Sequence, residues 1–423
     1  MTGPDTPPAT DARKILVIDA VNLDPLQLMS EEEASTFHFV CPPNAEGMFP
    51  AKCSVDILPD PFEHSGALEL ALSKLVGSGI RTDAILCPHE VLLVRIAEMC
   101  AAAGINDMTA ESAMVFRDKV VMKEHARAAG IACPDFFAID RPGQLLRILA
   151  EDPRPFVLKP RAAGGAVGIQ KIDAPRQELG DVLHGFFPEC SIPYQEQQGL
   201  YILENWVDAP VVSINGLMAD GNMLHAWPMA YFNSMMGARA GRAVGDYTLT
   251  SDDPAAARLV EFADECIAAF PPGRLRPFHL EAFDSPAGPL FCEIAARCGG
   301  PPTAQLHAMA TGVDLLRSWL GLDRLKEPVV PERVTTSYGQ LEIMAQKGTL
   351  VRKPDAPPPF DFVSEFQCFL DIGDLGGIGD DAVVLASCHI TAPSSLSMPE
   401  RMALVEHWAT ESFEFDCDGT QDA

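Results

Sequence analysis

The chain has 423 residues, 47% of them hydrophobic, so it can bury several hydrophobic cores in roughly two to four domains. Its formal net charge is −28, from 59 acidic and 31 basic residues. Nucleic acids and anionic lipid surfaces are recognised chiefly by clustered Lys and Arg, so we expect this acidic chain to bind neither.

The 12 cysteines are scattered from Cys41 to Cys417, without a C-x-x-C pair or a metal-type cluster with histidines. We interpret them as small buried apolar residues in a reducing compartment. The segment Met1 to Arg13 is polar and has no apolar signal core, and no stretch approaches about 18 uninterrupted apolar residues. These features predict a cytoplasmic protein without a membrane anchor.

The first hundred residues have the pattern of an α/β domain. Short apolar runs at 14–18, 55–58 and 84–87 predict buried parallel strands. The last run leads into a predicted helix from about Glu90 to Ala103, which Gly104 would cap. The first strand is not followed by G-x-G-x-x-G, so the sequence gives little support for dinucleotide binding.

The middle of the chain alternates helices, strands and loops. A helix is predicted from Phe116 to Ala129, and an extended connection follows at 131–139. Further strands are predicted at 154–160, 201–207 and 211–214, together with a strand-turn-strand unit at 275–293. The segment from Asn233 to Tyr247 is rich in Met, Gly and Arg and predicts a mobile loop. Residues 337–415 predict short strands and a helix near 399–410, in a smaller C-terminal unit.

The strongest motif is the predicted hairpin, because it carries two glutamates. If the hairpin is symmetric about Ala287, Glu281 lies directly opposite Glu293 on the same face. Like charges ~5 Å apart repel by about 3 kcal/mol at an effective dielectric of ~20, and a divalent cation reverses the sign of that interaction. Carboxylates together with nucleotide phosphates are ligands that Mg²⁺ prefers. The pair therefore predicts a Mg²⁺ site, with Mn²⁺ as an alternative ion.

A simpler interpretation of the pair is that one glutamate faces solvent, or that each pairs with an arginine such as Arg274, Arg276 or Arg297. The shared face, the apolar flanking residues and the following Arg297-Cys298-Gly299-Gly300 favour the metal. A planar guanidinium beside the metal could hold a phosphoryl group in transfer or an acyl phosphate.

Lys159 ends an apolar strand directly before a loop that contains Gly164, Gly165 and Gly168, where backbone N–H groups can approach a phosphate. The loop is not a Walker A loop, because its lysine precedes the glycines. Alternatively, the glycines form a simple turn and the lysine protects a sheet edge. Lys119, at the start of a helix, has an equally simple interpretation as a solvated helix charge.

Taken in chain order, these motifs resemble the ATP-grasp superfamily, and within it carboxylate-amine ligases such as the L-amino-acid ligases. The resemblance spans most of the chain and rests on the order and spacing of five segments: 83–86, 117–119, 157–168, 203–207 and 279–300. It implies an α/β ATP-grasp fold in three parts. These are an N-terminal parallel-sheet domain (1–108), an ATP-binding domain (109–328) with a lid at about 140–207, and a C-terminal subdomain (329–423).

The resemblance also implies a role for individual residues. Lysines, lid glycines and an interdomain strand would bind ATP: Lys119, Lys159, Gly164, Gly165, Gly168, Glu204, Asn205, Trp206 and Val207. Glu281 and Glu293 would hold Mg²⁺, and Arg297, Lys159 and Glu293 would be the catalytic residues. The chain departs from its relatives at Ala295, where many carry an asparagine metal ligand, and at Val211, where a ribose-binding acid often stands. Water could replace the first group, and Asp208 could substitute for the second.

The predicted reaction is in-line transfer of the ATP γ-phosphoryl group to a carboxylate, which we expect to belong to an amino acid. An amine then attacks the acyl phosphate, and ADP and phosphate are released. Candidate substrate contacts are His89, Glu90, Arg239, Arg242, Gly299 and Gly300. The alternatives are that the arginines belong to a surface loop and that Glu90 only complements a helix dipole.

Two other functions fit the same resemblance. One is a carboxylase-type reaction that uses bicarbonate, and the other is a non-catalytic nucleotide-binding module whose metal site has decayed, which Ala295 permits. In the ligase interpretation, the partners are a small carboxylate and an amine. A homodimer is expected from the resemblance only.

Overall fold

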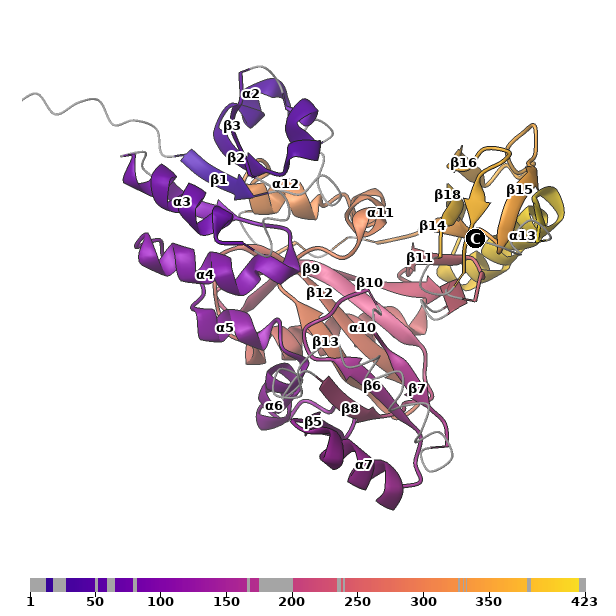
Figure 1. The fold of residues 1–423 in the computed structure, drawn as a ribbon, viewed down its shortest axis with the longest axis horizontal. Helices are drawn as coiled ribbons and strands as arrows, with labels where there is room; N and C mark the ends of the chain where they lie inside the picture. The colour runs from indigo at the N-terminus through magenta and orange to yellow at the C-terminus, as the bar shows by residue number, and fades with distance from the viewer. Residues whose placement is uncertain are drawn as a thin grey trace, which may run out of the picture.

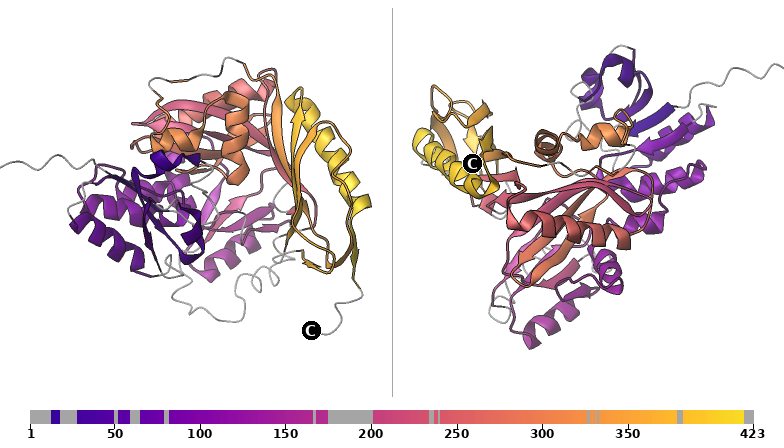
Figure 2. Two further views of the ribbon diagram at one scale, coloured as in Figure 1. Left: turned by 90° about the horizontal axis from the view of Figure 1, so that it is seen from above. Right: turned by 180° about the vertical axis from the view of Figure 1, so that it is seen from behind.

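A computed structural model describes residues 13–17, 28–49, 52–58, 65–78, 82–165, 168–174, 201–233, 237–238, 240–325, 328–329, 331, 333–378 and 382–417. An N-terminal α/β unit and a C-terminal unit lie on opposite sides of a central group of strands (Figure 1). The views from above and from behind show the same arrangement (Figure 2). The predicted mixed α/β fold that begins with a parallel sheet is confirmed.

The N-terminal sheet has the strand order β3-β2-β1-β4, and all its strand pairs are parallel. Its strands are β1 (Arg13–Val17), β2 (Phe37–Cys41), β3 (Ser54–Ile57) and β4 (Thr82–Leu86). The associated helices are α2 (Glu31–Ala34), η1 (Pro43–Met48), α3 (Ala67–Gly77), η3 (Glu90–Leu92) and α4 (Leu93–Ala102). The sequence prediction lacks β2, whose apolar run is interrupted by His38. That buried histidine is satisfied by Ser54 and Asp56 of the neighbouring strand.

Two helices connect this unit to the rest of the chain, where one was predicted. They are α5 (Ala110–Val115) and α6 (Lys119–Ala128). The break falls before Asp118, whose side chain accepts hydrogen bonds from the backbone N–H groups of Val120 and Val121 and so starts a new helix. Helix α6 packs against β13 of the central sheet, which brings its first residue, Lys119, towards that sheet.

A small antiparallel sheet has the strand order β5-β8-β6-β7. Its elements are β5 (Phe136–Ile139), α7 (Pro142–Glu151), β6 (Phe156–Pro160), β7 (Gln170–Ile172) and β8 (Tyr201–Asn205). The apolar side of α7 packs on this sheet, with Leu145 and Leu149 against Phe156 and Leu158. The strands predicted at 154–160 and 201–207 are therefore confirmed as β6 and β8.

The largest sheet has eight strands in the order β13-β12-β9-β10-β11-β14-β18-β16, and all its strand pairs are antiparallel. The strands are β9 (Val211–Ala219), β10 (Asn222–Phe232), β11 (Val244–Thr248), β12 (Arg276–Ser285), β13 (Gly288–Ala295), β14 (Ser337–Met344), β16 (Val363–Cys368) and β18 (Val384–Ala392). Helix α10 (Pro254–Ala269) packs against β9 and β10.

The prediction of a mobile loop from Asn233 to Tyr247 is wrong for its last part. Residues from Val244 onward form β11, which pairs with β10 on one side and with β14 on the other. A segment with two strand partners is an interior strand, and the partner β14 lies far away in the sequence. Residues 234–236 and 239 lie outside the described residues.

Strands β14, β18 and β16 carry the central sheet into the C-terminal unit, so the described part of that unit shares a continuous sheet with the centre. Its other elements are β15 (Gly348–Arg352), β17 (Leu375–Gly376), η7 (Ser395–Ser397), α13 (Met398–Ser412) and β19 (Glu414–Asp416). Helices α11 (Pro301–Thr311) and α12 (Leu315–Leu320) follow β13. Within the described ranges, no helix has the length and apolar character needed to cross a membrane.

Candidate active site

The β12–β13 hairpin places Glu281 opposite Glu293, the pairing that the sequence predicts, but through a different register. Ser285 pairs with Gly288, so the turn is centred between Pro286 and Ala287. With this centre and no irregularity, Glu281 would pair with Cys292, one residue away from Glu293. A register shift after Glu281, with Cys292 as the extra residue, restores their alignment. The pairing of the two carboxylates thus depends on a β-bulge.

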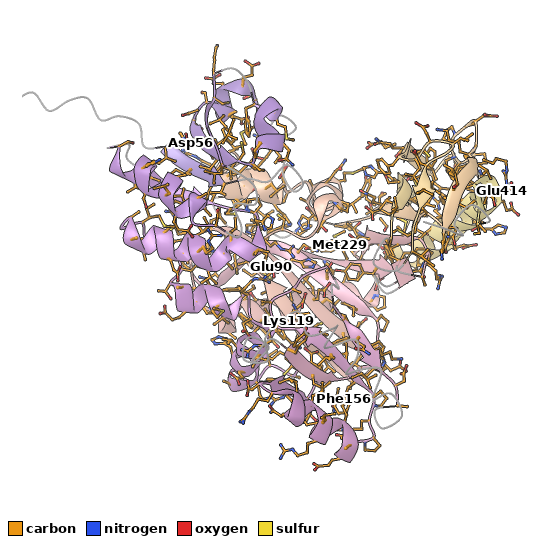
Figure 3. The ribbon with its side chains drawn as sticks, viewed as in Figure 1. Asp56, Glu90, Lys119, Phe156, Met229 and Glu414 are labelled. Carbon is orange, nitrogen blue, oxygen red and sulfur yellow. The ribbon has the colours of Figure 1, made fainter. Side chains whose placement is uncertain are left out.

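Both glutamates line a cleft of about 750 Å³. It lies where the N-terminal unit meets the central sheet, close to the positions of Glu90 and Lys119 (Figure 3). Other predicted site residues in its lining are His89, Glu90, Lys159, Gly164, Gly165, Arg297, Gly299 and Gly300. Lining residues to which sequence reasoning gave no role include Arg117, Tyr231, Asp246 and His279. The cleft therefore brings together charged groups from segments far apart in the sequence.

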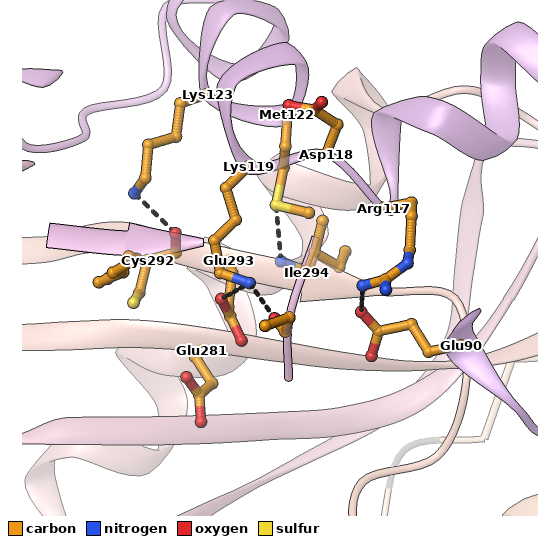
Figure 4. Close-up of polar contacts among 12 residues, drawn as sticks. Glu90, Arg117, Asp118, Lys119, Met122, Lys123, Glu281, Cys292, Glu293 and Ile294 are labelled. Atoms are coloured by element: carbon orange, nitrogen blue, oxygen red, sulfur yellow. Dashed lines mark hydrogen bonds and ion pairs between the residues drawn. The ribbon is translucent and has the colours of Figure 1, made fainter. Parts of the chain in front are cut away.

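Lys119 contacts both Glu293, a predicted metal ligand, and the glycine loop. Its Nζ lies 3.0 Å from Oε2 of Glu293 and donates a hydrogen bond to the carbonyl oxygen of Ala163 at 2.6 Å (Figure 4). The lysine is 7% exposed, so it is not the solvated helix charge of the simpler interpretation. One carboxylate of the pair is thus balanced by a lysine at the start of α6.

Glu281 lies close to two donors, His279 on its own strand and Tyr231 on β10. The hydroxyl of Tyr231 donates to its Oε1 at 2.7 Å, and Nε2 of His279 lies 3.7 Å from the same oxygen. Burial alone would raise the pKa of Glu281, but the hydrogen bond and charge of His279, the Tyr231 hydroxyl and the charge of Lys159 lower it. Glu281 is therefore ionised at neutral pH and can act as a metal ligand.

A buried ion cluster supports Lys159. Its Nζ lies 3.1 Å from Oε2 of Glu204, while Nζ of Lys123 lies 3.5 Å from Oε1 and donates to the carbonyl oxygen of Cys292 at 2.7 Å. Burial alone would lower the pKa of Lys159, but the Glu204 carboxylate raises it above the usual value. Burial opposes ionisation of Glu204 too, yet Lys123 and Lys159 hold its pKa down. Lys159 therefore stays charged. Lys123, one helical turn after Lys119 on α6, is a residue of this cluster that the sequence did not predict.

The strand predicted to meet adenine, 204–207, has some of its backbone donors already occupied. The N–H of Asn205 donates to the carbonyl oxygen of Asp135 at 2.9 Å, and that of Trp206 donates to the carbonyl oxygen of Pro155 at 3.0 Å. Asn205 also carries a buried Oδ1 that has no hydrogen-bond partner among the described residues. The cleft lining includes none of residues 204–208. Nucleotide-base contacts by this strand stay a prediction.

Two glycines stand where a side chain would collide. At Gly168, with φ of +69°, a Cβ would lie 2.8 Å from Cγ of Pro160. At Gly299, a Cβ would lie 2.6 Å from Oγ1 of Thr303 and 3.0 Å from Nδ1 of His279. The first glycine lets the loop fold back on β6, although Gly168 itself is not in the cleft lining. The second lets the backbone approach the cleft directly before α11.

Of the two arginines predicted for the loop, Arg242 does not line the cleft. Arg242 is exposed, and its Nε lies 3.8 Å from Oε1 of Glu406 on α13. Its predicted contact with a substrate therefore has no support from this geometry, because Arg242 is not in the cleft lining and its guanidinium lies beside Glu406. Arg239 lies outside the described residues.

Glu90 joins Arg297 to a second arginine. The Nε of Arg297 donates to Oε2 of Glu90 at 2.8 Å, and Nη2 lies 2.6 Å from the same oxygen. Nη1 of Arg117 donates to the other oxygen, Oε1, at 3.2 Å. Arg297 therefore pairs with Glu90 and not with either glutamate of the hairpin. Arg117 stands in the sequence directly before the Asp118-Lys119 pair.

Asp246 and Tyr231 lie opposite each other on β11 and β10 and line the same cleft. Burial raises the pKa of Asp246 to about 6; His279 opposes the shift, and the Glu342 and Glu281 carboxylates add to it. Sequence reasoning missed Asp246 because it assigned this part of the chain to a loop.

Comparison with known proteins finds similarity at the level of structure. No protein-family model and no curated protein matches the sequence. The L-amino acid ligase from Bacillus licheniformis superposes with a TM-score of 0.69 at 16% identity, over 96% of this chain and 99% of that chain. The biotin carboxylase domain of Hydrogenobacter thermophilus 2-oxoglutarate carboxylase, solved with MgADP, ADP and bicarbonate, gives 0.64 at 15% identity, over 96% and 90%.

A third similar structure is the carboxyaminoimidazole ribonucleotide synthase from Aspergillus clavatus, which was solved in complex with ATP. It superposes with a TM-score of 0.63 at 16% identity, over 94% of this chain and 99% of that chain. At identities this low, the likeness concerns the fold and not the substrates. The chain has the ATP-grasp fold that these three proteins share.

Proposed function

We propose that the chain is an ATP- and Mg²⁺-dependent ligase that joins a carboxylate, as in an amino acid, to an amine and releases ADP and phosphate. The observation that carries this proposal is the pairing of Glu281 with Glu293 on adjacent strands that face a cleft. The same cleft contains Lys159 and the glycine loop. The similarity to an L-amino acid ligase supports the choice of reaction.

The acidic pair has the chemistry that Mg²⁺ requires. Two carboxylates on one rung repel each other unless a cation lies between or beside them, and in this structure Lys119 balances Glu293. Mg²⁺ keeps much of its shell for water and phosphate, so two carboxylates are an adequate protein contribution. Among the described residues, no three His, Cys, Asp or Glu side chains form a metal-type cluster, so the protein ligands proposed here are the two glutamates.

The cleft also has room and charge for a nucleotide. Its volume of about 750 Å³ is typical of a small-molecule site, for which ~300–1,000 Å³ is usual. Lys159 is held ionised by Glu204, and Lys119 bonds the glycine loop, so both lysines could meet phosphate oxygens. The buried Oδ1 of Asn205, which has no hydrogen-bond partner among the described residues, is a group that a nucleotide base could use, although Asn205 itself is not in the cleft lining.

The residues act by positioning and by charge. Lys159 and Lys119 would offset the charge of the transferring phosphoryl group, while the substrate carboxylate attacks it in line. Bound Mg²⁺ would add further charge neutralisation at the phosphate oxygens. Arg297 would hold the resulting acyl phosphate until the amine attacks its carbonyl carbon and phosphate leaves. No protein nucleophile is needed for either step.

The first test replaces each metal candidate by its uncharged isostere. Glu281→Gln and Glu293→Gln should each lower carboxylate-dependent ADP release by at least ~100-fold, since an interaction worth about 2.7 kcal/mol in the transition state is lost. ADP is measured with a panel of amino acids, and hydroxylamine replaces the amine so that any acyl phosphate is trapped as a hydroxamate. Glu265→Gln, on the exposed side of α10, makes the same change of charge as a control. Equal turnover in Glu293→Gln and this control contradicts the metal assignment.

A second candidate function is a carboxylase that uses bicarbonate, and similarity to the biotin carboxylase domain favours it. It predicts ADP release that requires bicarbonate and incorporation of labelled bicarbonate into product. The ligase proposal predicts ADP release that requires an organic acid and continues without bicarbonate. A third outcome, nucleotide binding without ADP release under either condition, indicates a non-catalytic module.

A further inference from the structure

The cluster of Arg117, Glu90 and Arg297 joins three segments at the wall of the cleft. Glu90 begins η3 after β4, Arg117 precedes α6, and Arg297 follows β13. All three line the cleft, and their side chains are 12% (Arg117), 15% (Glu90) and 25% (Arg297) exposed. Figure 4 shows the Arg117 guanidinium meeting the Glu90 carboxylate beside the hairpin that carries Glu293.

A count of donors shows what the cluster leaves available. A guanidinium has five N–H groups. In Arg297, Nε and Nη2 face Oε2 of Glu90, and Nη1 donates to the carbonyl oxygen of Cys298 at 2.7 Å. This fixes the guanidinium plane and, within the described residues, leaves one N–H on each terminal nitrogen for an external anion. Arg117 uses one N–H, at Oε1 of Glu90, within the described residues.

The charge count points the same way. Two guanidiniums share one carboxylate, so the cluster carries one unit of excess positive charge at the edge of a cleft. Both oxygens of Glu90 already accept bonds from arginines, so Glu90 is poorly placed for its predicted role as a direct substrate contact. Its geometry suits a different role, in which it holds two cationic side chains in place for an external anion.

We propose that Glu90 is a positioning residue and that Arg117 is a second anion-binding residue of the carboxylate site. Glu90 fixes Arg117 and Arg297 so that their remaining N–H groups face one anion, the carboxylate that accepts the phosphoryl group. The identity of that anion rests on the proposed function. Because Glu90 comes from the N-terminal unit, that unit takes part in building the site for the acid.

The test separates the Michaelis constant for the acid from that for ATP. In Glu90→Gln, the amide NH₂ faces a guanidinium, so KM for the acid should rise by ~10-fold or more while KM for ATP changes by less than about 2-fold. Arg117→Met should have a similar effect, and Glu90→Asp should recover part of the loss. Glu98→Gln, an exposed site on α4, makes the same change of charge as Glu90→Gln and should leave both constants unchanged.

A purely structural role for the cluster predicts another pattern, in which both KM values rise together and the melting temperature falls. That pattern, or an unchanged KM for the acid in Glu90→Gln and Arg117→Met, overturns the proposal. Lys159→Ala is a useful contrast, because it should raise KM for ATP instead.

The inference can be tested even where the wild-type protein shows no acid-dependent ADP release, a result that would refute the proposed function. Inorganic phosphate is then titrated calorimetrically into the wild type and the variants. Glu90→Gln and Arg117→Met should weaken phosphate binding by ~5-fold or more relative to Glu98→Gln, as expected when a charge-assisted bond is lost. Equal phosphate affinities in all these proteins, or no phosphate binding by any of them, contradict an anion site at this cluster.

Discussion

The carboxylate of Asp246 is partly buried at the cleft, and the nearby Glu342 and Glu281 add to the cost of its charge. With a pKa raised to about 6 in the folded chain against 3.8 for an ordinary aspartate, it keeps its proton where the unfolded chain has lost it. Stability therefore falls as the pH rises from about 4 through 6, and the full penalty is present above that range. A bound metal ion would offset this penalty by supplying positive charge.

We therefore expect Asp246→Asn to stabilise the ligand-free protein at about pH 8, by up to roughly 3 kcal/mol in the free energy of unfolding. The gain should shrink as the pH falls through the folded pKa of about 6 and should nearly vanish at about pH 3, below the unfolded pKa of 3.8, because the wild-type side chain is then largely neutral in both states. Denaturant unfolding at both pH values measures it. Asp264→Asn, on the exposed side of α10, is the matched control. An equal or lower stability of Asp246→Asn at pH 8 contradicts the burial argument.

Single residues differ in how far the sequence predicts them. The motif spacing predicts the alignment of Glu281 with Glu293, although a bulge at Cys292 and an off-centre turn combine to produce it. Lys123 and Asp246 could not be predicted in this way, because their environment is set by the neighbours of their strands and helices in space. Lys123 faces Glu204, a residue of a strand that lies 81 positions further along the chain.

Helix α6 and strands β6 and β8 are connected by the buried Glu204 carboxylate. Each of its oxygens faces a different lysine, Lys123 on α6 and Lys159 on β6. Lys123 also bonds the backbone of β13 at Cys292, the bulge residue. The cluster therefore fixes the helix, the small sheet and the glutamate hairpin relative to one another, with Lys159 at the cleft.

Removing one charge from this cluster should lower the stability of the fold. Lys123→Met leaves Glu204 buried with a single partner, so the free energy of unfolding should fall by about 3 to 5 kcal/mol. In Lys123→Met with Glu204→Gln, the loss should be smaller than the sum of the two single losses, because the uncompensated charge is gone. Denaturant unfolding measures each variant, and Lys74→Met on the exposed side of α3 is the control. Strict additivity of the two changes argues against a direct interaction.

Strands are predicted correctly from the sequence where a run of apolar residues within the strand itself defines them. The strands β1 and β4 and the hairpin β12–β13 are predicted from their apolar runs and turn residues. Strand β11 contains Gly245 and Asp246 and has no such run, and its place in the sheet depends on β14, which begins 89 residues after β11 ends. The residues of β11 alone do not show that a distant strand will pair with them, so the sequence predicts a loop where β11 forms.

At the scale of the whole molecule, the cleft lies where three parts of the chain meet. The N-terminal unit contributes Glu90, the small sheet and its loop contribute Lys159, and the central sheet contributes both glutamates. The chain carries a net charge of −28, so an anionic nucleotide meets attraction only where cations are concentrated. Lys159, Arg117 and Arg297 line the cleft together with Glu90, Asp246, Glu281 and Glu293, so attraction for a nucleotide there would depend on bound Mg²⁺ as well. The predicted domain boundaries at 108/109 and 328/329 and the predicted homodimer remain predictions.

The central claim is that a phosphoryl group passes from ATP to a substrate carboxylate beside the acidic pair. It is tested most directly with a carboxylate substrate labelled with ¹⁸O in both oxygens, followed by mass spectrometry of the released phosphate. An acyl-phosphate pathway predicts one ¹⁸O atom in each phosphate molecule, because the oxygen that attacks the phosphorus leaves with it. Phosphate that contains no ¹⁸O, released while the amide product forms, would contradict the account.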